Sequence, residues 1–136
     1  MIFERKTFSI GDLGIILTGK TPPTSNIDFY GGDFPFYTPS DMDGRRFLRD
    51  TKRTLSELGA NSVKRSIIEP FSIMVSCIGS DMGKVAIALK RGVTNQQINT
   101  IVPHKWVDPF YLYYSLYPRK KELQSLASGG SAQPIL

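Results

Sequence analysis

Apolar residues near the N-terminus recur at a spacing typical of a helix. They are Phe8, Ile10, Leu13, Ile16 and Leu17. Because this spacing is close to the 3.6-residue helical period, it predicts a short helix that begins after Ser9 and ends at Gly19.

Residues 20–44 contain many residues that interrupt regular structure: Pro22, Pro23, Gly31, Gly32, Pro35, Pro39 and Gly44. The segment is therefore not expected to hold a long helix or strand. One short strand is predicted over residues 34–38, where aromatic side chains alternate with smaller ones.

The second half of the chain predicts most of the sheet. Apolar runs over residues 71–78 and 84–89 are separated by a short segment rich in turn formers, as in a β-hairpin. Residues 98–102 predict a third strand. Between these regions, Thr54 stands three residues before Glu57, which predicts a helical turn over residues 54–58 opened by a capping box.

A helix is predicted near the C-terminus. Asp108 is suited to the N-cap and Pro109 to the first helical position, and the helix is expected to continue over residues 110–117 and 119–127 with a kink at Pro118. Its aromatic side chains are expected to fill a core or an interface. Short strands mixed with few helices, without a strand–helix–strand repeat, predict an α+β fold with a twisted mixed or antiparallel sheet.

Composition narrows the class of protein. The chain has 136 residues, of which 40% are hydrophobic, so we expect one domain over residues 1–136. The net charge of +5 slightly favours an acidic partner. A single cysteine, Cys77, excludes an internal disulfide, and no apolar run approaches the ~18 residues of a membrane span. A soluble, cytoplasmic protein is expected.

Residues 14–21 match the pattern of a phosphate-binding loop, with Gly14, Gly19, Lys20 and Thr21 at the required spacing. Such a loop must follow a buried strand and open a long helix whose N-terminal amides hold the phosphates. Two prolines follow Thr21 at once, and no helical apolar period comes after them. Nucleotide binding is therefore not expected.

No catalytic or metal site is predicted elsewhere. The segment Asp108-Pro109-Phe110-Tyr111 approaches a motif of amino-methyltransferases but lacks its second proline, and the chain has no glycine-rich loop suited to S-adenosylmethionine. His104 has no second histidine or cysteine at metal-ligand spacing. We therefore expect a binding module and not an enzyme.

Several segments, in order along the chain, form a family pattern: Thr18-Gly19-Lys20-Thr21-Pro22, Tyr30-Gly31-Gly32, Phe34-Pro35-Phe36-Tyr37-Thr38-Pro39-Ser40-Asp41, Thr54-Leu55-Ser56-Glu57-Leu58-Gly59, the apolar strand before Gly79 with Gly83-Lys84, Thr94-Asn95-Gln96-Gln97-Ile98, and Phe110-Tyr111-Leu112-Tyr113. Together they resemble the target-recognition domains of type I restriction-modification specificity subunits. Two local departures are Phe36, where the family often has Trp, and Cys77-Ile78-Gly79-Ser80, where a Ser- or Thr-rich stretch is usual.

The resemblance implies a single module that reads double-stranded DNA and performs no chemistry itself. Methyltransferase and restriction subunits are the implied protein partners. S-adenosylmethionine, ATP and Mg are expected on those partners, with no cofactor bound by this chain. Family members usually hold two such domains separated by long helices, so this chain is expected to be the first module of a longer subunit.

Candidate DNA contacts follow from side-chain chemistry, since cations hold phosphates and amides or hydroxyls read base edges. The densest basic stretch, residues 45–65, supplies Arg45, Arg46, Arg49, Lys52 and Arg53. Turns and loops supply Lys20, Thr21, Ser40, Ser80 and Lys84, and three adjacent amides are Asn95, Gln96 and Gln97. Phosphate contact is favoured for the basic stretch over a solvated surface with local salt bridges, whereas the amides could equally brace neighbouring loops.

Two other functions remain open at this point. A module for single-stranded nucleic acid or RNA would use exposed aromatic side chains between cations to stack unpaired bases. A protein-docking domain would use its basic face to hold an acidic subunit. The aromatic residues mostly lie in strand or helix patterns, which favours burial and hence duplex binding.

Overall fold

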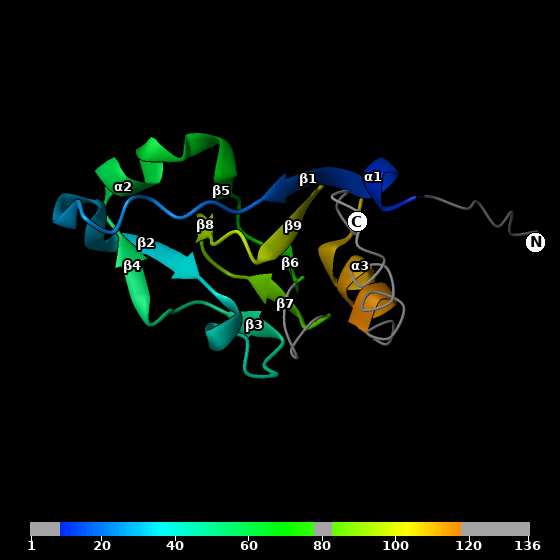
Figure 1. Ribbon diagram of the computed structural model, residues 1–136. Helices are drawn as coiled ribbons and strands as arrows, with labels where there is room; N and C mark the ends of the chain where they lie inside the picture. The colour runs from blue at the N-terminus through cyan, green and yellow to red at the C-terminus, as the bar shows by residue number, and fades with distance from the viewer. Residues whose placement is uncertain (1–8, 78–82, 118–136) are drawn as a thin grey trace, which may run out of the picture.

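Two β-sheets form the centre of the molecule (Figure 1). The computed structural model describes residues 9–77 and 83–117. The first sheet has the strand order β1-β9-β6-β7-β3, with bounds β1 Gly14–Thr18, β9 Ile98–Pro103, β6 Ile73–Ser76, β7 Val85–Ala88 and β3 Phe47–Leu48. The second has the order β4-β2-β8-β5, with bounds β4 Arg53–Leu55, β2 Tyr30–Tyr37, β8 Gly92–Thr94 and β5 Ile67–Ile68.

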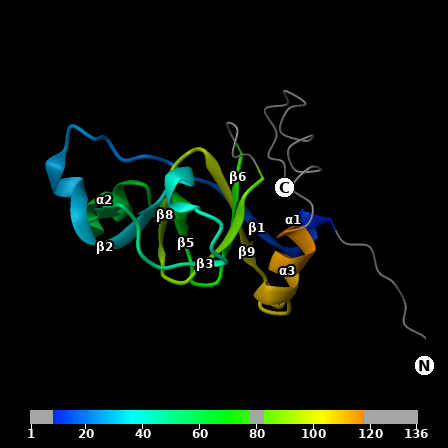
Figure 2. The same cartoon turned by 90° about the horizontal axis from the view of Figure 1, so that it is seen from below.

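The helices are short and lie outside the sheets. The α-helices are α1 Ile10–Leu13, α2 Glu57–Ser62 and α3 Pro109–Leu116, and the 3₁₀ turns are η1 Ile27–Phe29, η2 Pro39–Asp41 and η3 Lys64–Ser66. Figures 1 and 2 show α2 and α3 at opposite ends of the molecule. Most strand pairs are antiparallel, but β2 pairs with β8 and β3 pairs with β7 in parallel. The predicted α+β class with a mixed sheet is confirmed.

The central strands β6 and β7 of the five-stranded sheet are buried on both faces, which explains their continuous apolar sequence. In β6, Ile73 and Val75 join the cluster that packs against α3, while Met74 between them joins the cluster that contains Tyr37 and Ile98. Successive side chains of a strand point to opposite faces, so both faces of β6 need apolar residues. A third cluster, around Phe36 and Leu55, packs against α2.

The hairpin of β6 and β7, the strand β9 and the helix α3 confirm the predictions for the second half. The Asp108 side chain caps α3 by accepting a hydrogen bond from the backbone N–H of Phe110 at 2.9 Å. The predicted continuation over residues 119–127 lies outside the described residues.

The predicted N-terminal helix is wrong after its first turn. It begins after Ser9, as expected, but ends at Leu13, and Gly14–Thr18 forms β1, which pairs antiparallel with β9. β-Branched Ile15, Ile16 and Thr18 favour the extended chain. Gly14 allows the close approach, because a Cβ there would lie 2.4 Å from the Val102 carbonyl oxygen.

Two further local predictions are wrong. Residues 20–44 do hold a long strand, the eight-residue β2, whose register against β4 shifts between Tyr30 and Phe34 and so accommodates Gly31-Gly32. Thr54 belongs to β4 and does not open a helix. Instead Ser56 caps α2, its hydroxyl accepting a hydrogen bond from the N–H of Gly59 at 3.0 Å.

Candidate nucleic-acid interface

Three segments that carry predicted contact residues meet at one edge of the four-stranded sheet. We call them the polar edge: residues 38–41, 52–53 and 95–97. They border a hollow of about 400 Å³ lined by Thr38, Pro39, Ser40, Asp41, Lys52, Arg53, Asn95 and Gln97. The structure therefore brings together Ser40, Lys52, Arg53, Asn95 and Gln97 from the predicted set.

Strand direction explains this convergence. Because β2 and β8 run parallel, with Tyr37 beside Thr94, the segments that follow them leave the sheet at the same edge. The N–H of Asn95 donates to the carbonyl of Tyr37 at 3.0 Å, which joins the two exits. β4 runs antiparallel to β2, so its first residue, Arg53, lies beside Phe36 near the same edge.

Asp41 holds the polar edge together, and sequence analysis did not select it as a site residue. Its carboxylate accepts hydrogen bonds from the N–H and hydroxyl of Thr38, at 2.9 and 3.0 Å, and from the N–H of Lys52 at 3.0 Å. The side chain is buried. The spacing of Thr38 and Asp41 is that of a capping box, so the signal was present in the sequence.

Two of the three adjacent amides take part in internal hydrogen bonds. The side-chain oxygen of Asn95 accepts from the N–H of Gln97 at 3.0 Å, and that of Gln96 accepts from the hydroxyl of Thr21 at 2.6 Å. Within residues 9–77 and 83–117, no hydrogen bond to the Gln97 side chain is found, and this half-buried side chain lines the hollow. The side chains of Asn95 and Gln96 thus hold the loop conformation through internal hydrogen bonds.

Lys20 and Thr21 lie against the turn that carries these amides. The N–H of Lys20 donates to the carbonyl of Thr94 at 2.9 Å, and a Cβ on Gly19 would overlap the backbone of Asn95. The Lys20 side chain is exposed. Residues 14–18 form a strand and residues 21–26 contain no helix, so the phosphate-loop pattern is not folded as such a loop.

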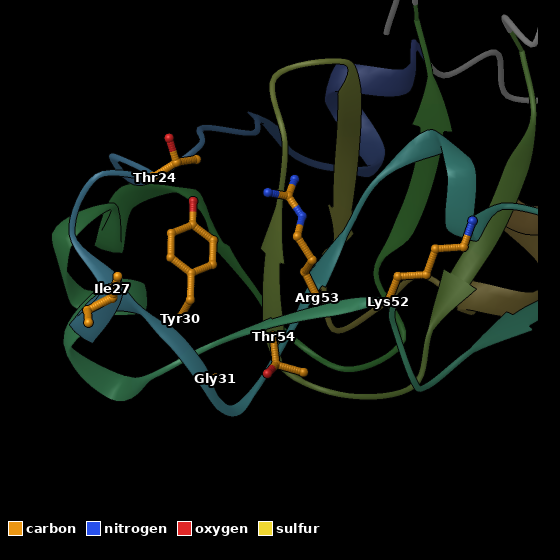
Figure 3. A pocket seen from close by; sticks show the side chains of 7 residues that line it. All are labelled: Thr24, Ile27, Tyr30, Gly31, Lys52, Arg53 and Thr54. Atoms are coloured by element: carbon orange, nitrogen blue, oxygen red, sulfur yellow. The ribbon is translucent and has the colours of Figure 1, made fainter.

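A second hollow, of about 430 Å³, adjoins the first and shares Lys52 and Arg53 with it. Figure 3 shows the side chains of Tyr30 and Arg53 rising side by side, whereas Lys52 extends away from them. The guanidinium carbon of Arg53 lies 5.0 Å from the ring centroid of Phe36 and 5.9 Å from that of Tyr30. The Tyr30 hydroxyl donates to the carbonyl of Pro22 at 2.7 Å, which fixes its ring.

The remaining basic candidates lie elsewhere. A separate hollow of about 410 Å³ is lined by Arg45 and Lys84, among others, and not by Arg53. The Lys84 ammonium donates to the Met42 carbonyl at 2.8 Å. Arg45 pairs with Asp43 at 2.9 Å, and this contact lowers the pKa of the Asp43 carboxyl.

Two other members of the basic stretch have different surroundings, and one candidate cannot be placed. The guanidinium carbon of Arg46 lies 5.0 Å from the Tyr114 ring centroid, and Arg49 is exposed. Ser80 lies outside the described residues. The basic stretch is thus divided between two regions of the surface.

The expected burial of the α3 aromatic residues holds only in part. Tyr113 is buried, but Phe110, Tyr111, Tyr114 and Tyr117 are exposed, with Tyr111 at 69%. The helix presents a narrow buried stripe to the sheet through Leu112, Tyr113 and Leu116, so the intervening aromatic residues face outwards.

Other binding chemistries find little support in the described part of the chain. It holds no group of three side chains suited to a metal ion. None of its helices is long and apolar enough to cross a membrane. Burial raises the pKa of the Cys77 thiol, which reduces its thiolate fraction near neutral pH.

Comparison with known proteins identifies the family of this chain. Residues 4–136 match the model of the type I restriction modification DNA specificity domain. The HindI specificity subunit of Haemophilus influenzae is 44% identical over 91% of this chain, and the MjaIX specificity subunit of Methanocaldococcus jannaschii is 32% identical over 93%. The chain spans 27% and 30% of the lengths of these relatives.

A solved structure supports the fold independently. The HsdS subunit from Thermoanaerobacter tengcongensis superposes on this chain with a TM-score of 0.66 and 20% sequence identity. The match covers 85% of this chain and 28% of the HsdS chain. Since the family model covers nearly all of the sequence, the chain belongs to the type I restriction modification DNA specificity domain family.

Proposed function

We propose that this chain binds double-stranded DNA through the polar edge and acts as a target-recognition module of a type I specificity subunit. The observation that carries the proposal is the convergence of Lys52, Arg53 and Gln97 at one hollow, with the backbone of Lys20 bonded to the Thr94 carbonyl close by. Cations hold phosphates whatever the sequence, and polar side chains between them can meet base edges. Family membership supports the same function.

The affinity of this chain alone is expected to be that of nonspecific complexes, roughly 10⁻⁴ to 10⁻⁶ M at physiological salt. One module offers few contacts, and other parts of a complete subunit would add more. Titration of a fluorescent duplex at several salt concentrations measures both the affinity and the number of phosphate contacts. Nanomolar binding would contradict this expectation.

Paired variants test whether the polar edge is the binding surface. Arg53→Ala should weaken duplex binding, because it removes a cation that lines both hollows. Arg91→Ala removes the same charge at the opposite end of β8, where Arg91 pairs with Glu69 at 3.3 Å, and should leave binding nearly unchanged. Equal losses in both variants would argue against a defined surface.

We further propose that the module itself is non-catalytic, carries no cofactor and works in the cytoplasm. Its protein partners would be methyltransferase and restriction subunits, on which S-adenosylmethionine, ATP and Mg would reside. The strand at residues 14–18 supports the absence of a nucleotide site. ATP hydrolysis by the purified chain that disappears in Lys20→Ala would overturn this proposal.

A second candidate is binding to single-stranded nucleic acid, and one observation favours it. The exposed rings of Tyr111 and Tyr114 on α3, with Arg46 over Tyr114, could stack unpaired bases. Competition between a duplex and single strands of equal length separates the two functions. Preference for single strands that is lost in Tyr111→Ala and Tyr114→Ala would support this alternative over the duplex.

A further inference from the structure

We propose that Arg53 and Gln97 are the base-reading side chains of the polar edge, Arg53 facing a guanine and Gln97 an adenine. The inference rests on the proposed DNA binding and adds a division of work among the polar side chains. The loops are positioned by Asp41, Asn95, Gln96 and Thr21. Phosphates would be held by Lys20 and Lys52.

Arg53 is held in place before any ligand arrives. Its guanidinium lies over Phe36, which is fully buried, and beside Tyr30, whose ring is fixed by the hydrogen bond to Pro22. Aromatic faces that hold a cation restrict its rotamers and reduce the entropy lost on binding. The planar fork of arginine can then donate two parallel hydrogen bonds to O6 and N7 of guanine.

The charge of Arg53 is also available. In the part of the chain that the structure describes, no carboxylate forms an ion pair with Arg53, whereas Arg45 and Arg91 each have one. Arg53 lines both adjoining hollows, so it stands where a ligand in either would meet it. Its neighbour Lys52 is directed elsewhere, since its ammonium donates to the Ser40 carbonyl at 3.3 Å.

Gln97 has a fixed backbone and a side chain that makes no hydrogen bond to the described residues. Its N–H donates to the side-chain oxygen of Asn95 at 3.0 Å, and its carbonyl accepts from the N–H of Cys77 at 2.8 Å. The neighbouring amides of Asn95 and Gln96 are occupied by internal hydrogen bonds. Gln97 is therefore the one of the three whose amide group can pair with N6 and N7 of adenine without breaking a hydrogen bond found in the described chain.

The test is selection from a pool of duplexes with a randomised central segment. The chain is incubated with the pool, and bound duplexes are sequenced, which detects base preferences even at micromolar affinity. The wild-type chain should enrich a guanine at one position and an adenine at a nearby position. At least roughly fivefold enrichment is expected, the lower end for a bidentate contact.

Conservative variants then separate reading from holding. Arg53→Lys keeps the charge but not the fork, so it should lose the guanine preference while affinity for the unselected pool and its salt dependence stay the same. Gln97→Ala should lose only the adenine preference, with unchanged thermal stability. Arg91→Lys and Asn61→Ala, at an exposed amide of α2, are the matched controls and should keep the wild-type profile.

Several outcomes would overturn the inference. Arg53→Lys that retains the guanine preference, or that weakens all duplexes alike, would make Arg53 a phosphate contact. Gln97→Ala that melts earlier and binds every sequence less well would make Gln97 a brace. Control variants that lose the same preferences would show that these preferences do not come from Arg53 and Gln97. Salt-dependent binding by the wild type without enrichment at any position would also overturn it, leaving DNA binding intact. No duplex binding at all would instead overturn the proposed function.

Discussion

The hydroxyl of Thr21 donates a 2.6 Å hydrogen bond to the side-chain oxygen of Gln96, joining two loops that lie 75 residues apart in the sequence. Lys20, next to Thr21, is bound to the same turn through its backbone N–H, which contacts the Thr94 carbonyl. This side-chain bond therefore helps to hold the backbone of Lys20 beside the polar edge.

Thr21→Val should lower the free energy of unfolding by about 0.5–1.5 kcal/mol, toward the lower end because the bond is exposed to solvent. A double-mutant cycle with Gln96→Ala, measured by urea denaturation, isolates the contribution of the pair. Thr24→Val, at an exposed threonine of the same segment, serves as the control. Additive effects of Thr21→Val and Gln96→Ala would show that the pair is not coupled.

Asp41→Ala should destabilise the chain strongly, by about 2–4 kcal/mol, because it leaves the backbone N–H groups of Thr38 and Lys52 without their acceptor. The neighbouring Asp43 is exposed and forms its ion pair with Arg45, also exposed, so Asp43→Ala should change stability little. Urea denaturation of both variants measures the difference. Similar stabilities would show that the buried carboxylate does not hold the polar edge.

Local pattern was sufficient for some elements and insufficient for others. β6 and β7 were predicted because strands buried on both faces need uninterrupted apolar residues, and α3 because Asp108 and Pro109 mark a helix start. The apolar residues at 15–17 suit a helix and a strand equally, and pairing with β9 decided between them. β3, β5 and β8 have only two or three residues each, too few to show any period.

The same limit applies to the candidate site. Side-chain chemistry was enough to select Lys52, Arg53 and Gln97, but their convergence depends on the parallel pairing of β2 with β8, which no local pattern encodes. The roles of the amides depend on the hydrogen bonds that they form in the folded chain, because an amide that braces a loop and one that reads a base are the same residue type in the sequence.

Tyr37 makes the fold sensitive to alkaline pH. Its hydroxyl donates a hydrogen bond to the Lys90 carbonyl at 2.8 Å. Burial raises the pKa of this hydroxyl above the usual range for tyrosine. Above pH ~10 the unfolded chain loses this proton while the folded chain keeps it, so stability should fall by about 1.4 kcal/mol per pH unit from this group. The stabilising effect is fully present below pH ~10.

The matched variant for this effect is Tyr37→Phe, which cannot ionise. Its stability should be lower than that of the wild type near neutral pH, by about 1 kcal/mol for the missing hydrogen bond, but should decline less steeply above pH ~10. Thermal unfolding measured at several pH values compares the two slopes. Parallel slopes would show that Tyr37 ionises equally easily in both states.

Arg45 and Arg46 test how far the bound duplex extends beyond the polar edge. Arg45 lines the separate hollow near β3, and Arg46 lies over Phe47 of β3. Neither residue lines the hollow that Arg53 and Gln97 share. Replacing both with Ala should weaken binding to all duplexes alike and reduce the slope of log K against log salt by about 0.9 for each phosphate that is no longer neutralised. Base preferences in the selected pool should survive, because phosphate contacts carry no sequence information. An unchanged slope would confine the DNA to the polar edge, whereas an altered base preference would place part of the reading surface beside β3.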